Sequence, residues 1–338
     1  MGGSADPKVL HLYDAADVGA TLVRYGRRQG LSWRHFNKVP PSDVGSVLPG
    51  APLPARARRL LAQTSWQAAR AAGILRADLL HLHSGSRLGI VRSRPHRPFV
   101  LHFHGTDIRT QFHDPVRRPV LQWGADHAAA VLYSTPDLRP HAELARPDAV
   151  YLANPVDLEE LPAWAPASRP RVAFASRWDD SKGGSAQLET AKALAASAGP
   201  GVELQGLDWG AGAAGAAGHG VKLLPKMSKP QYLRWLASAH CVIGQGTGIM
   251  GMSELQAVAI GAPVVMPLGE GYYPGPSPVL QGSTPEELAA QAVAALADPA
   301  GTSGQLAGRA WVEAHHSPQQ VVARLADIYR ELAGHRQH

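Results

Sequence analysis

Short apolar runs alternate with helix-forming stretches along the whole chain, and this alternation restricts the fold more than any other feature. Strands covered on both faces read as continuous apolar runs, and parallel strands need a helix between them. The apolar runs lie at residues 9–13, 78–83, 98–104, 130–134 and 149–152 in the first half, and at 171–176, 202–206, 221–224, 241–244 and 263–266 in the second. The sequence therefore predicts an α/β protein with two doubly wound, Rossmann-like parallel sheets.

The length of the chain supports a division into two domains. With 338 residues it exceeds what one hydrophobic core usually supports. We expect an N-terminal domain over residues 1–157 and a C-terminal domain over residues 158–316. A final helix is expected over residues 317–338, because Ser317 and Gln320 form a capping box ahead of an apolar helical pattern.

Two segments lack any regular pattern. Pro162, Pro166 and Pro170 interrupt residues 158–170, which predicts a linker that acts as a hinge. Residues 210–220 are almost entirely Gly and Ala, which predicts a mobile surface loop.

Composition excludes several classes of protein. Hydrophobic residues make up 45% and charged residues 18% of the chain, which is typical of a globular enzyme and not of a disordered chain. No apolar stretch approaches the roughly 18 to 20 residues of a membrane span, and the N-terminus lacks a signal pattern, so we expect a cytoplasmic protein. The single cysteine, Cys241, lies in an apolar run and is expected to be a buried residue without a functional role.

Positive charge is concentrated in the first half. Residues 1–157 contain 20 Lys and Arg against 12 Asp and Glu, whereas the remainder contains 13 against 15. The arginines lack an interleaved aromatic series or a recognisable motif, so nucleic acid is not an expected partner. An anionic acceptor, an anionic membrane surface and a simple solvated surface remain alternatives. Arg56, Arg58 and Arg59, which precede an apolar helical pattern, are the candidates for membrane contact.

Arg177 and Lys182 form the first candidate binding segment. They follow an expected strand and precede a helical pattern, with Gly183 and Gly184 at the turn. A strand, a glycine turn and a helix N-terminus together form an anion site, because free N–H groups and the helix dipole converge there. At an effective dielectric constant near 20, each charge pair about 4 Å apart contributes roughly 4 kcal/mol. The pattern fits a diphosphate site, and its alternative is a surface loop that carries two cations.

A glycine-rich loop at residues 244–252 is the second candidate. Its sequence GQGTGIMGM lets the backbone approach a ligand closely, and Ser253 with Gln256 predicts a capping box that starts the next helix. The loop fits a sugar or phosphate, although a plain turn between strand and helix has the same pattern.

These segments, with others, resemble the family 4 retaining glycosyltransferases of GT-B fold over nearly the whole chain. The motif RWDDSKG at 177–183 is similar to the family segment G-R-L…K-G, ANPVD at 153–157 to P-N-G-V-D, and LQAVAIGAPVV at 255–265 to L-E-A-M-A-C-G-T-P-V-V. The resemblance implies two Rossmann-like domains that face a central cleft, with a C-terminal helix that crosses back to the first domain. It also implies that Arg177 and Lys182 bind the diphosphate of a nucleotide-sugar donor.

The sequence departs from this family at its two glutamates, which are separated by seven residues. Gly248 and Gln256 stand at the aligned positions. Gln256 can still hydrogen-bond ribose hydroxyls, and backbone N–H groups from Gly248 to Met252 can hold the sugar and phosphate. Glu254 lies two residues before Gln256 and points to another side of a helix, so it is not a simple replacement.

In the first half, two segments are expected near the donor or the acceptor. Gly19 opens a helix after the first strand, so a phosphate or acceptor can approach it closely. His104 belongs to a His-Gly-Thr-Asp segment, and the resemblance implies that it orients the donor sugar. His81, His83 and His102 are interpreted as strand residues, one of which can reach the edge of the cleft by alternation.

The resemblance also implies the remaining roles in the expected site. It implies catalytic roles for His104, Arg177 and Lys182, and a transfer that retains configuration. The expected donor site comprises Gly19, Arg177, Lys182, Gly248, Ile249, Met250, Gly251, Met252 and Gln256. The expected base-binding segment comprises Leu224, Pro225, Lys226 and Met227. No metal is expected, because no Cys or His cluster has ligand spacing and the two cations already neutralise phosphate.

The sequence predicts a hexosyltransferase that uses a UDP- or GDP-sugar as co-substrate, needs no cofactor and transfers the sugar to an acceptor. Two alternatives remain. One is a GT-B scaffold that binds a nucleotide sugar, or supports a partner, without turnover. The other is an epimerase-like or phosphorylase-like enzyme of the same fold. Residues 36–54 and 85–97 are the loops expected to form the acceptor pocket.

Overall fold

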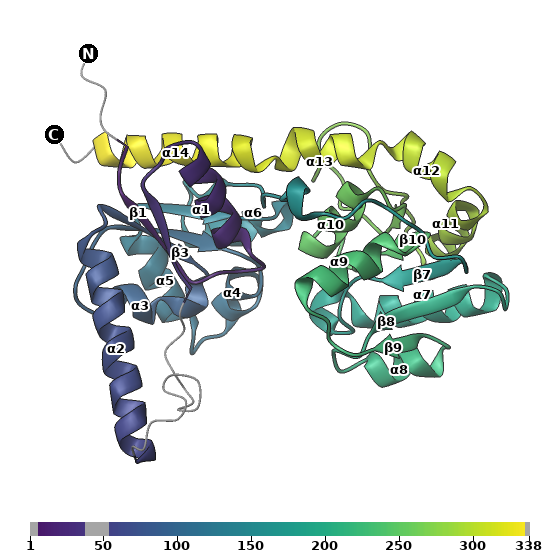
Figure 1. The fold of residues 1–338 in the computed structure, drawn as a ribbon, viewed down its shortest axis with the longest axis horizontal. Coiled ribbons are helices and arrows are strands. Elements are labelled where there is room, and N and C mark those ends of the chain that lie inside the picture. Colours follow the sequence, from purple (N-terminus) through teal and green to yellow (C-terminus); the bar gives the residue numbers. More distant parts are fainter. Residues whose placement is uncertain (1–5, 38–53, 335–338) are drawn as a thin grey trace. The chain divides into compact units, whose positions relative to one another are not determined.

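A computed structural model describes residues 6–37 and 54–334, and these fold into two compact units (Figure 1). The first unit contains the segment that ends at Ser134, residues Leu138–Pro155 and the segment that begins at Pro318. The second contains residues Val156–Ser317 and the short piece Thr135–Asp137. Part of the expected acceptor segment 36–54 lies outside the described residues.

The first unit is built on a six-stranded parallel sheet in the order β2-β1-β3-β4-β5-β6. Its strands are β1 (Val9–Leu12), β2 (Trp33–Phe36), β3 (Leu79–His83), β4 (Phe99–Phe103), β5 (Ala130–Tyr133) and β6 (Val150–Tyr151). The five strands expected in this half are confirmed to within about one residue at each end. Strand β2 was not predicted, because Trp33, Arg34, His35 and Phe36 mix apolar and polar residues at the edge of the sheet, without an apolar run.

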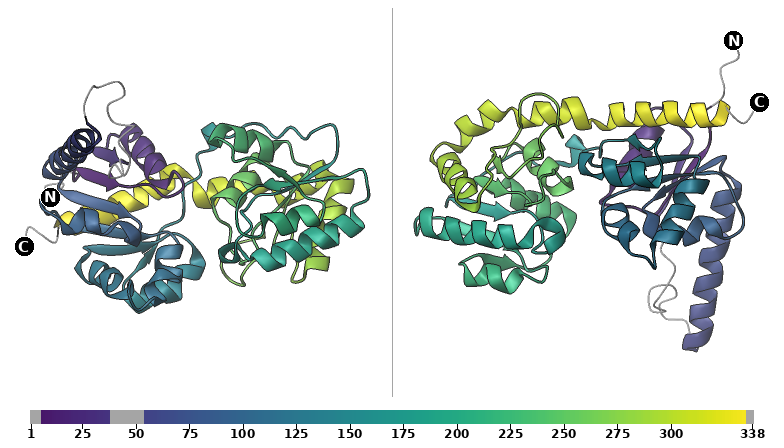
Figure 2. Two further views of the ribbon diagram at one scale, coloured as in Figure 1. Left: turned by 90° about the horizontal axis from the view of Figure 1, so that it is seen from below. Right: turned by 180° about the vertical axis from the view of Figure 1, so that it is seen from behind.

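Helices cover both faces of this sheet (Figures 1 and 2). They are α1 (Val18–Arg28), α2 (Ala55–Leu75), α3 (Gly89–Arg92), α4 (Thr106–Arg109), α5 (Arg118–His127), α6 (Arg139–Ala145) and α14 (Pro318–Gly334). The final helix α14 packs beside α1 and inserts Tyr329, which is fully buried, against the sheet. The expected return of the last helix to the first domain is thus confirmed, since α14 belongs to the first unit.

The second unit holds a five-stranded parallel sheet in the order β11-β10-β7-β8-β9. Its strands are β7 (Arg171–Phe174), β8 (Glu203–Leu207), β9 (Lys222–Leu224), β10 (Cys241–Ile243) and β11 (Val264–Val265). Its helices are α7 (Gly184–Ser197), α8 (Ala213–Gly218), α9 (Lys229–Ala237), α10 (Met252–Ile260), α11 (Pro285–Ala297), α12 (Pro299–Leu306) and α13 (Gly308–His316). All five strands predicted for this half are present.

Two hydrophobic cores lie on the two faces of the second sheet. Side chains alternate along β7, so that Val172 and Phe174 join the core under α7 and α11, whereas Ala173 and Ala175 join the core under α9, α10 and α13. This alternation is the period of two that every strand imposes. Cys241 is fully buried in the first of these cores, and burial raises the pKa of its thiol to about 12, in agreement with a packing role.

Two local expectations are wrong. Residues 213–218 form helix α8, whose Ala213 and Ala216 are buried, because small side chains let this helix lie close to its neighbours. The proline-rich segment is not a free hinge: Trp164 Nε1 donates to Ala239 O at 2.8 Å, and Ala165 N donates to Ala237 O at 3.0 Å. These hydrogen bonds tie the segment to the end of α9 and make it part of the second unit.

None of the helices in the described ranges combines the length and the apolar character that a membrane span requires.

The contact between α1 and β2 gives a first prediction. A Cβ added at Gly26 would lie 2.4 Å from Cε3 of the buried Trp33, so we expect Gly26→Ala to lower the free energy of unfolding by about 1–3 kcal/mol through overpacking. The matched control is Gly89→Ala, because an added Cβ there meets no atom within 4 Å. Urea unfolding of both variants measures the difference, and equal stabilities would contradict the packing argument.

Candidate functional site

The turn between β7 and α7 holds the two predicted cations. Arg177 Nε lies 2.5 Å from Asp179 Oδ2, and Arg177 Nη2 donates to Ser181 Oγ at 3.1 Å. Lys182 Nζ donates to Gln245 Oε1 at 3.1 Å. Neighbouring polar groups therefore orient both side chains at the carboxyl end of the sheet, where ligands bind in open α/β folds.

The two predicted binding segments are in direct contact. Gly246 N donates to Lys182 O at 2.9 Å, and a Cβ at Gly183 would lie 2.8 Å from the Gly246 backbone. Gly183 has φ = 73° and caps α7 without a side-chain hydrogen bond from the described residues. Only glycine meets both demands, because it has no Cβ and adopts positive φ readily. The structure thus brings the cationic turn and the glycine-rich loop together at the start of α7.

Glu254 fixes the shape of the glycine-rich loop, a role that the sequence did not reveal. Its buried carboxylate accepts hydrogen bonds from Ser176 Oγ at 2.8 Å, Gln245 N at 3.2 Å and Gly251 N at 2.9 Å. Helix α10 therefore begins at Met252 with Gly251 as N-cap, and the predicted capping box of Ser253 and Gln256 is wrong. A glutamate at the third helical position, reaching back to the cap N–H, was the signal for this role.

The backbone groups of the loop are only partly available. Met250 N donates to the Tyr273 hydroxyl at 2.6 Å, Gly251 N is held by Glu254, and the side chains of Ile249 and Met250 are buried. Met252 and Gln256 are half-buried. The expectation that backbone N–H groups from Gly248 to Met252 cradle a ligand thus needs correction at two positions, because those donors already have protein partners.

Gly248 adopts a conformation that suits glycine alone. Its φ is 78°, its carbonyl accepts from Gly269 N at 2.8 Å, and an added Cβ would lie 3.3 Å from that nitrogen. A side chain here would be strained both by the positive φ and by the close backbone. The loop is therefore shaped around a glycine at the position where the resemblance implies a glutamate.

Trp209 links the cationic turn to the predicted base-binding segment. The Arg177 guanidinium carbon lies 5.5 Å from the centre of the Trp209 ring, and Lys226 Nζ lies 5.0 Å from it. Trp209 is 45% exposed, although a large aromatic residue is usually buried. Of the predicted base-binding residues, Leu224 and Met227 are half-buried, whereas Pro225 and Lys226 are exposed. Sequence reasoning did not single out Trp209, which only the fold places beside Arg177.

In the first unit, the amide of Gly19 already has a partner. Gly19 N donates to Asp14 Oδ1 at 2.9 Å, and Ala20 N donates to Asp14 Oδ2 at 3.2 Å. A Cβ at Gly19 would lie 3.1 Å from His83 Nε2. The small residue is therefore explained by close packing against His83, and its predicted contact with a donor stays a prediction.

His104 directly follows β4, at the carboxyl edge of the first sheet. The buried carboxylate of Asp107 accepts from His104 N at 3.2 Å and from Gly105 N at 3.0 Å, and thereby shapes the loop. Burial lowers the pKa of the His104 imidazole to about 3. His104 is accordingly uncharged at neutral pH and can act there only as a hydrogen-bond partner or a ligand, not as a cation.

Five histidines, His11, His81, His83, His102 and His104, gather on one face of β1, β3 and the end of β4; we call them the histidine cluster. The strand register pairs His11 with His81 and His83 with His102, and the first four are fully buried. His81, His83 and His102 are thus strand residues, as expected, and the approach of one of them to the edge of the cleft stays a prediction. The cluster was missed because its members come from three separate segments of the chain, although the His-x-His pairs at 81/83 and 102/104 were a signal for it.

Burial depresses the basicity of the whole histidine cluster. It lowers the pKa of His81 to about 3, helped by the nearby His104. Burial and neighbouring histidines also lower the pKa values of His11, His83 and His102 well below the usual range. All five rings are consequently neutral at physiological pH.

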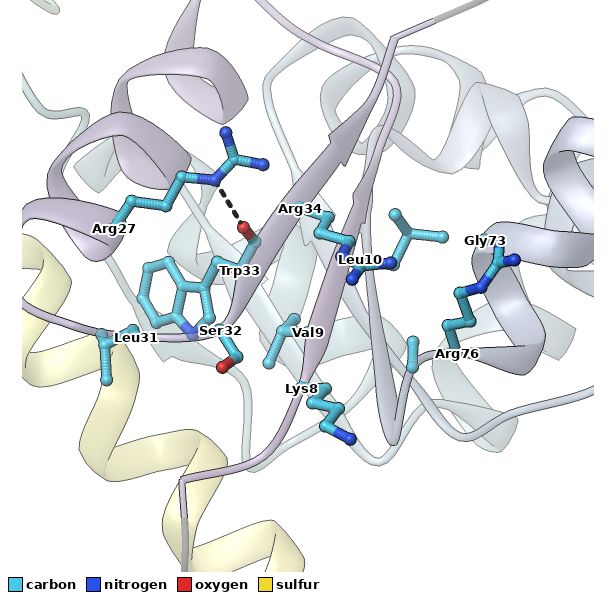
Figure 3. A pocket seen from close by; sticks show the side chains of 11 residues that line it. Lys8, Val9, Leu10, Arg27, Leu31, Ser32, Trp33, Arg34, Gly73 and Arg76 are labelled. Carbon is cyan, nitrogen blue, oxygen red and sulfur yellow. Dashed lines mark hydrogen bonds between the residues drawn. The ribbon is translucent and has the colours of Figure 1, made fainter.

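A separate pocket in the first unit lies at the opposite, amino end of the strands. Figure 3 shows the basic side chains Lys8, Arg27, Arg34 and Arg76 among its lining residues. Arg27 Nε donates to Trp33 O at 2.9 Å. Because ligands of open α/β sheets bind beyond the carboxyl ends of the strands, this pocket is distinct from the predicted donor site.

No protein-family model matches the chain, and no curated protein matches it by sequence. Solved structures do match its fold. Sucrose-phosphate synthase from Thermosynechococcus elongatus has a TM-score of 0.68 and 17% identity, with 97% of this chain and 99% of that chain covered. HepE from Anabaena, in complex with UDP and glucose, has a TM-score of 0.65 and 16% identity, with 95% and 98% covered.

A third similar structure is TarM from S. aureus, solved as a mutant in complex with fondaparinux, α-GlcNAc-glycerol and UDP. Its TM-score is 0.60 at 12% identity, with 74% of this chain and 55% of that chain covered. At such identities the likeness establishes architecture only. The chain has the GT-B fold of two doubly wound α/β units, as the sequence predicted.

Because the histidine cluster is neutral in the folded protein, we expect the free energy of unfolding to fall as the pH is lowered. In the unfolded chain a histidine takes up a proton below about pH 6.5, whereas the folded His81 and His104 do so only near pH 3. The unfolded state therefore binds more protons in this window, and each such residue lowers stability by up to about 1.4 kcal/mol per pH unit as the pH falls.

Urea unfolding between about pH 7.5 and 5, with a chelator present, measures this slope. We expect His81→Asn to make it shallower, since one buried neutral imidazole is removed. The exposed His113 provides the control, and His113→Asn should keep the wild-type slope. A wild-type stability that does not change over this pH range would contradict the prediction.

Proposed function

We propose that this protein is a glycosyltransferase that takes a sugar from a UDP- or GDP-sugar and transfers it to an acceptor. The observation that carries the proposal is the contact between the Arg177–Lys182 turn and the glycine-rich loop at the carboxyl edge of the second sheet. The resemblance to family 4 glycosyltransferases assigns the donor to these segments. HepE and TarM, which share the fold, are described in complex with UDP.

The proposed transfer depends on stabilising the negative charge of the leaving group. When the bond between sugar and phosphate breaks, negative charge develops on the leaving nucleoside diphosphate. Arg177 and Lys182 lie where they can stabilise that charge, and their neighbours Ser181 and Gln245 preorganise them. Two fixed cations replace the divalent metal that many diphosphate sites need, so we propose that transfer itself is independent of a metal on the diphosphate.

The exposed Trp209 ring extends the proposed donor site toward the nucleobase. It stands between Arg177 and Lys226, and Lys226 belongs to the predicted base-binding segment. Aromatic rings bind bases by stacking, worth roughly 1–3 kcal/mol per base. We propose that Trp209 stacks on or flanks the base while Arg177 binds the phosphates.

The proposed mechanism retains configuration. The leaving phosphate takes the acceptor proton, so few side chains need to change protonation state. His104 is neutral and would contribute a hydrogen bond to the donor sugar. Gln256, which is half-buried on α10, would bind ribose hydroxyls.

Binding without turnover is the second candidate function, and the conformation of Gly248 favours it. The positive φ and the close Gly269 backbone leave no room for the glutamate that the resemblance implies. The carboxylate of Glu254 is engaged by the loop itself and does not supply a substitute. A scaffold of this kind would bind the nucleotide but leave the donor intact.

The proposed donor site is tested by thermal stabilisation with UDP, GDP and their sugars. Arg177→Ala and Lys182→Met should each weaken nucleotide binding by roughly tenfold or more, since a charge-assisted hydrogen bond contributes about 1.5–3 kcal/mol. The control Lys192→Met removes an exposed cation of α7 that pairs with Glu189 at 3.4 Å and should bind as the wild type does.

Turnover then separates the candidate functions. Sugar transfer to an acceptor library supports the transferase, conversion of the donor without acceptor product supports an epimerase-like enzyme, and binding without conversion supports the scaffold. Absence of a shift with every nucleotide would refute the donor site.

We also propose that the amino-terminal turns of α2 contact anionic membranes. This part of α2 projects beyond the rest of the first unit (Figures 1 and 2). Leu60 and Leu61 are 62% and 47% exposed, and Arg56 and Arg59 are exposed beside them. Basic and apolar side chains together favour a surface that carries both negative headgroups and hydrocarbon.

Flotation with vesicles of neutral and anionic lipid tests this contact. Binding should require anionic lipid and fall severalfold in a Leu60→Ser/Leu61→Ser variant, whereas Leu144→Ser, which alters a leucine of α6 that is 59% exposed, should bind normally. Equal flotation with neutral lipid, or no flotation, would refute the membrane proposal.

A further inference from the structure

We propose that His83, His102 and His104 form a binding site for a divalent transition-metal ion of the zinc type. One ring nitrogen from each residue lies within 4.8 Å of those of the other two. The strand register places His83 beside His102, and His104 follows two residues later on the same face of the sheet. This site lies wholly in the first unit, and it does not depend on the proposed function.

The spacing of the ring nitrogens fits metal ligation. Zinc binds histidine nitrogen at about 2.0–2.1 Å, and tetrahedral geometry then sets ligand nitrogens roughly 3.3–3.4 Å apart. His83 Nδ1 lies 3.2 Å from His104 Nε2, and the ring centres of His102 and His104 are 4.1 Å apart. Small side-chain rotations would therefore bring all three rings to one ion.

One ring nitrogen of His102 favours a metal site over a set of hydrogen bonds between imidazoles. Its Nε2 is buried and has no hydrogen-bond partner in the described structure. An unpaired buried polar group costs about 1–3 kcal/mol, which makes such groups rare in folded proteins. A metal ion that accepts the lone pair of this nitrogen removes the cost.

The neighbouring histidines hold the other ring nitrogens of two of the proposed ligands. His83 Nε2 lies 3.1 Å from His11 Nδ1, and His102 Nδ1 lies 3.1 Å from His81 Nε2. His81 Nδ1 in turn contacts the hydroxyl of Tyr329 on α14. Ligating histidines usually hold their other ring nitrogen in such a hydrogen bond, which fixes ring orientation and tautomer.

The protonation states also suit a metal. Burial lowers the pKa of His104 to about 3 and holds the pKa values of His83 and His102 well below normal. Neutral imidazole is the form that ligates, and zinc, nickel and copper are the ions that imidazole favours.

Two histidine trios could hold an ion, and the partial exposure of His104 favours the one that contains it. His11, His81 and His83 also place ligand atoms within 4.8 Å, but all three are fully buried, so an ion has no direct path to them. His104 is only partly buried and gives the proposed site an entrance. Three histidine ligands leave a fourth position open for water or a substrate oxygen, which is the arrangement of catalytic zinc sites.

The test uses the full chain, purified without a polyhistidine tag and stripped with a chelator. Zn²⁺ is titrated by calorimetry, and Co²⁺ serves as a spectroscopic probe, because tetrahedral Co²⁺ absorbs strongly in the visible. We expect one ion per chain, visible bands typical of tetrahedral nitrogen ligation, and displacement of Co²⁺ by Zn²⁺.

Variants locate the ion. His102→Gln should weaken Zn²⁺ binding by at least about tenfold and abolish the visible bands. His81→Asn, which removes the ring in contact with His102 Nδ1, should weaken binding about 10–100-fold. The matched control is His113→Gln, since His113 Nε2 lies 2.9 Å from His141 Nδ1 in a surface pair. That control should bind as the wild type does.

Near-ultraviolet circular dichroism checks that each variant is folded. If His102→Gln does not fold, His104→Asn at the edge of the cluster replaces it, with metal affinity as the readout. The proposal is overturned if the wild type binds no Co²⁺ with these bands, or if both ligand variants bind as the wild type does. It is overturned equally if His113→Gln alone removes the binding.

Discussion

Parallel pairing of strands is the constraint on which the rest of this molecule depends. In each unit, hydrogen bonds fix the register of neighbouring strands, so that residues distant in sequence stand at one height of the sheet. Register places His11 beside His81 and His83 beside His102. It also sets the carboxyl ends of β7 and β10 side by side, from which the Arg177–Lys182 turn and the glycine-rich loop emerge.

In the second unit, close contact between these two segments is possible because side chains are absent where the backbones meet. Gly183 and Gly246 approach each other at distances that a Cβ would prevent. Buried Glu254 then accepts hydrogen bonds from both sides of the loop, which offsets the cost of burying a carboxylate. The result is an edge of the sheet at which hydrogen bonds orient two cations.

In the first unit, the dominant feature is the histidine cluster, a group of polar side chains largely buried in a hydrophobic core. Burying neutral imidazoles costs less than burying charges but still requires a partner for every ring nitrogen. Contacts among the rings and with Tyr329 meet most of this requirement. Tyr329 also connects the cluster to α14, so the last helix of the chain and the first strands of the sheet share one network.

The sequence by itself determined the class of fold and the location of most elements. Apolar runs identified ten strands, because a strand covered on both faces is built mostly from apolar residues. It also predicted Arg177, Lys182 and the glycine-rich loop as parts of one site, since cations and glycines have local signatures, and the structure places these segments in contact. The edge strand β2 lacked such a run, and the helix of residues 213–218 lacked any apolar pattern.

Only the tertiary structure decided how distant residues combine. Glu254 stands at the third position of its helix in the sequence, but most of its role depends on Ser176 and Gln245, whose donors the fold brings to its carboxylate. Trp209 and Arg177 are neighbours only because the segments after β8 and β7 converge. The histidine cluster draws on β1, β3 and the end of β4. Two His-x-His pairs stand in the sequence, but their meeting depends on register and burial, which are properties of the assembled sheet and not of any one segment.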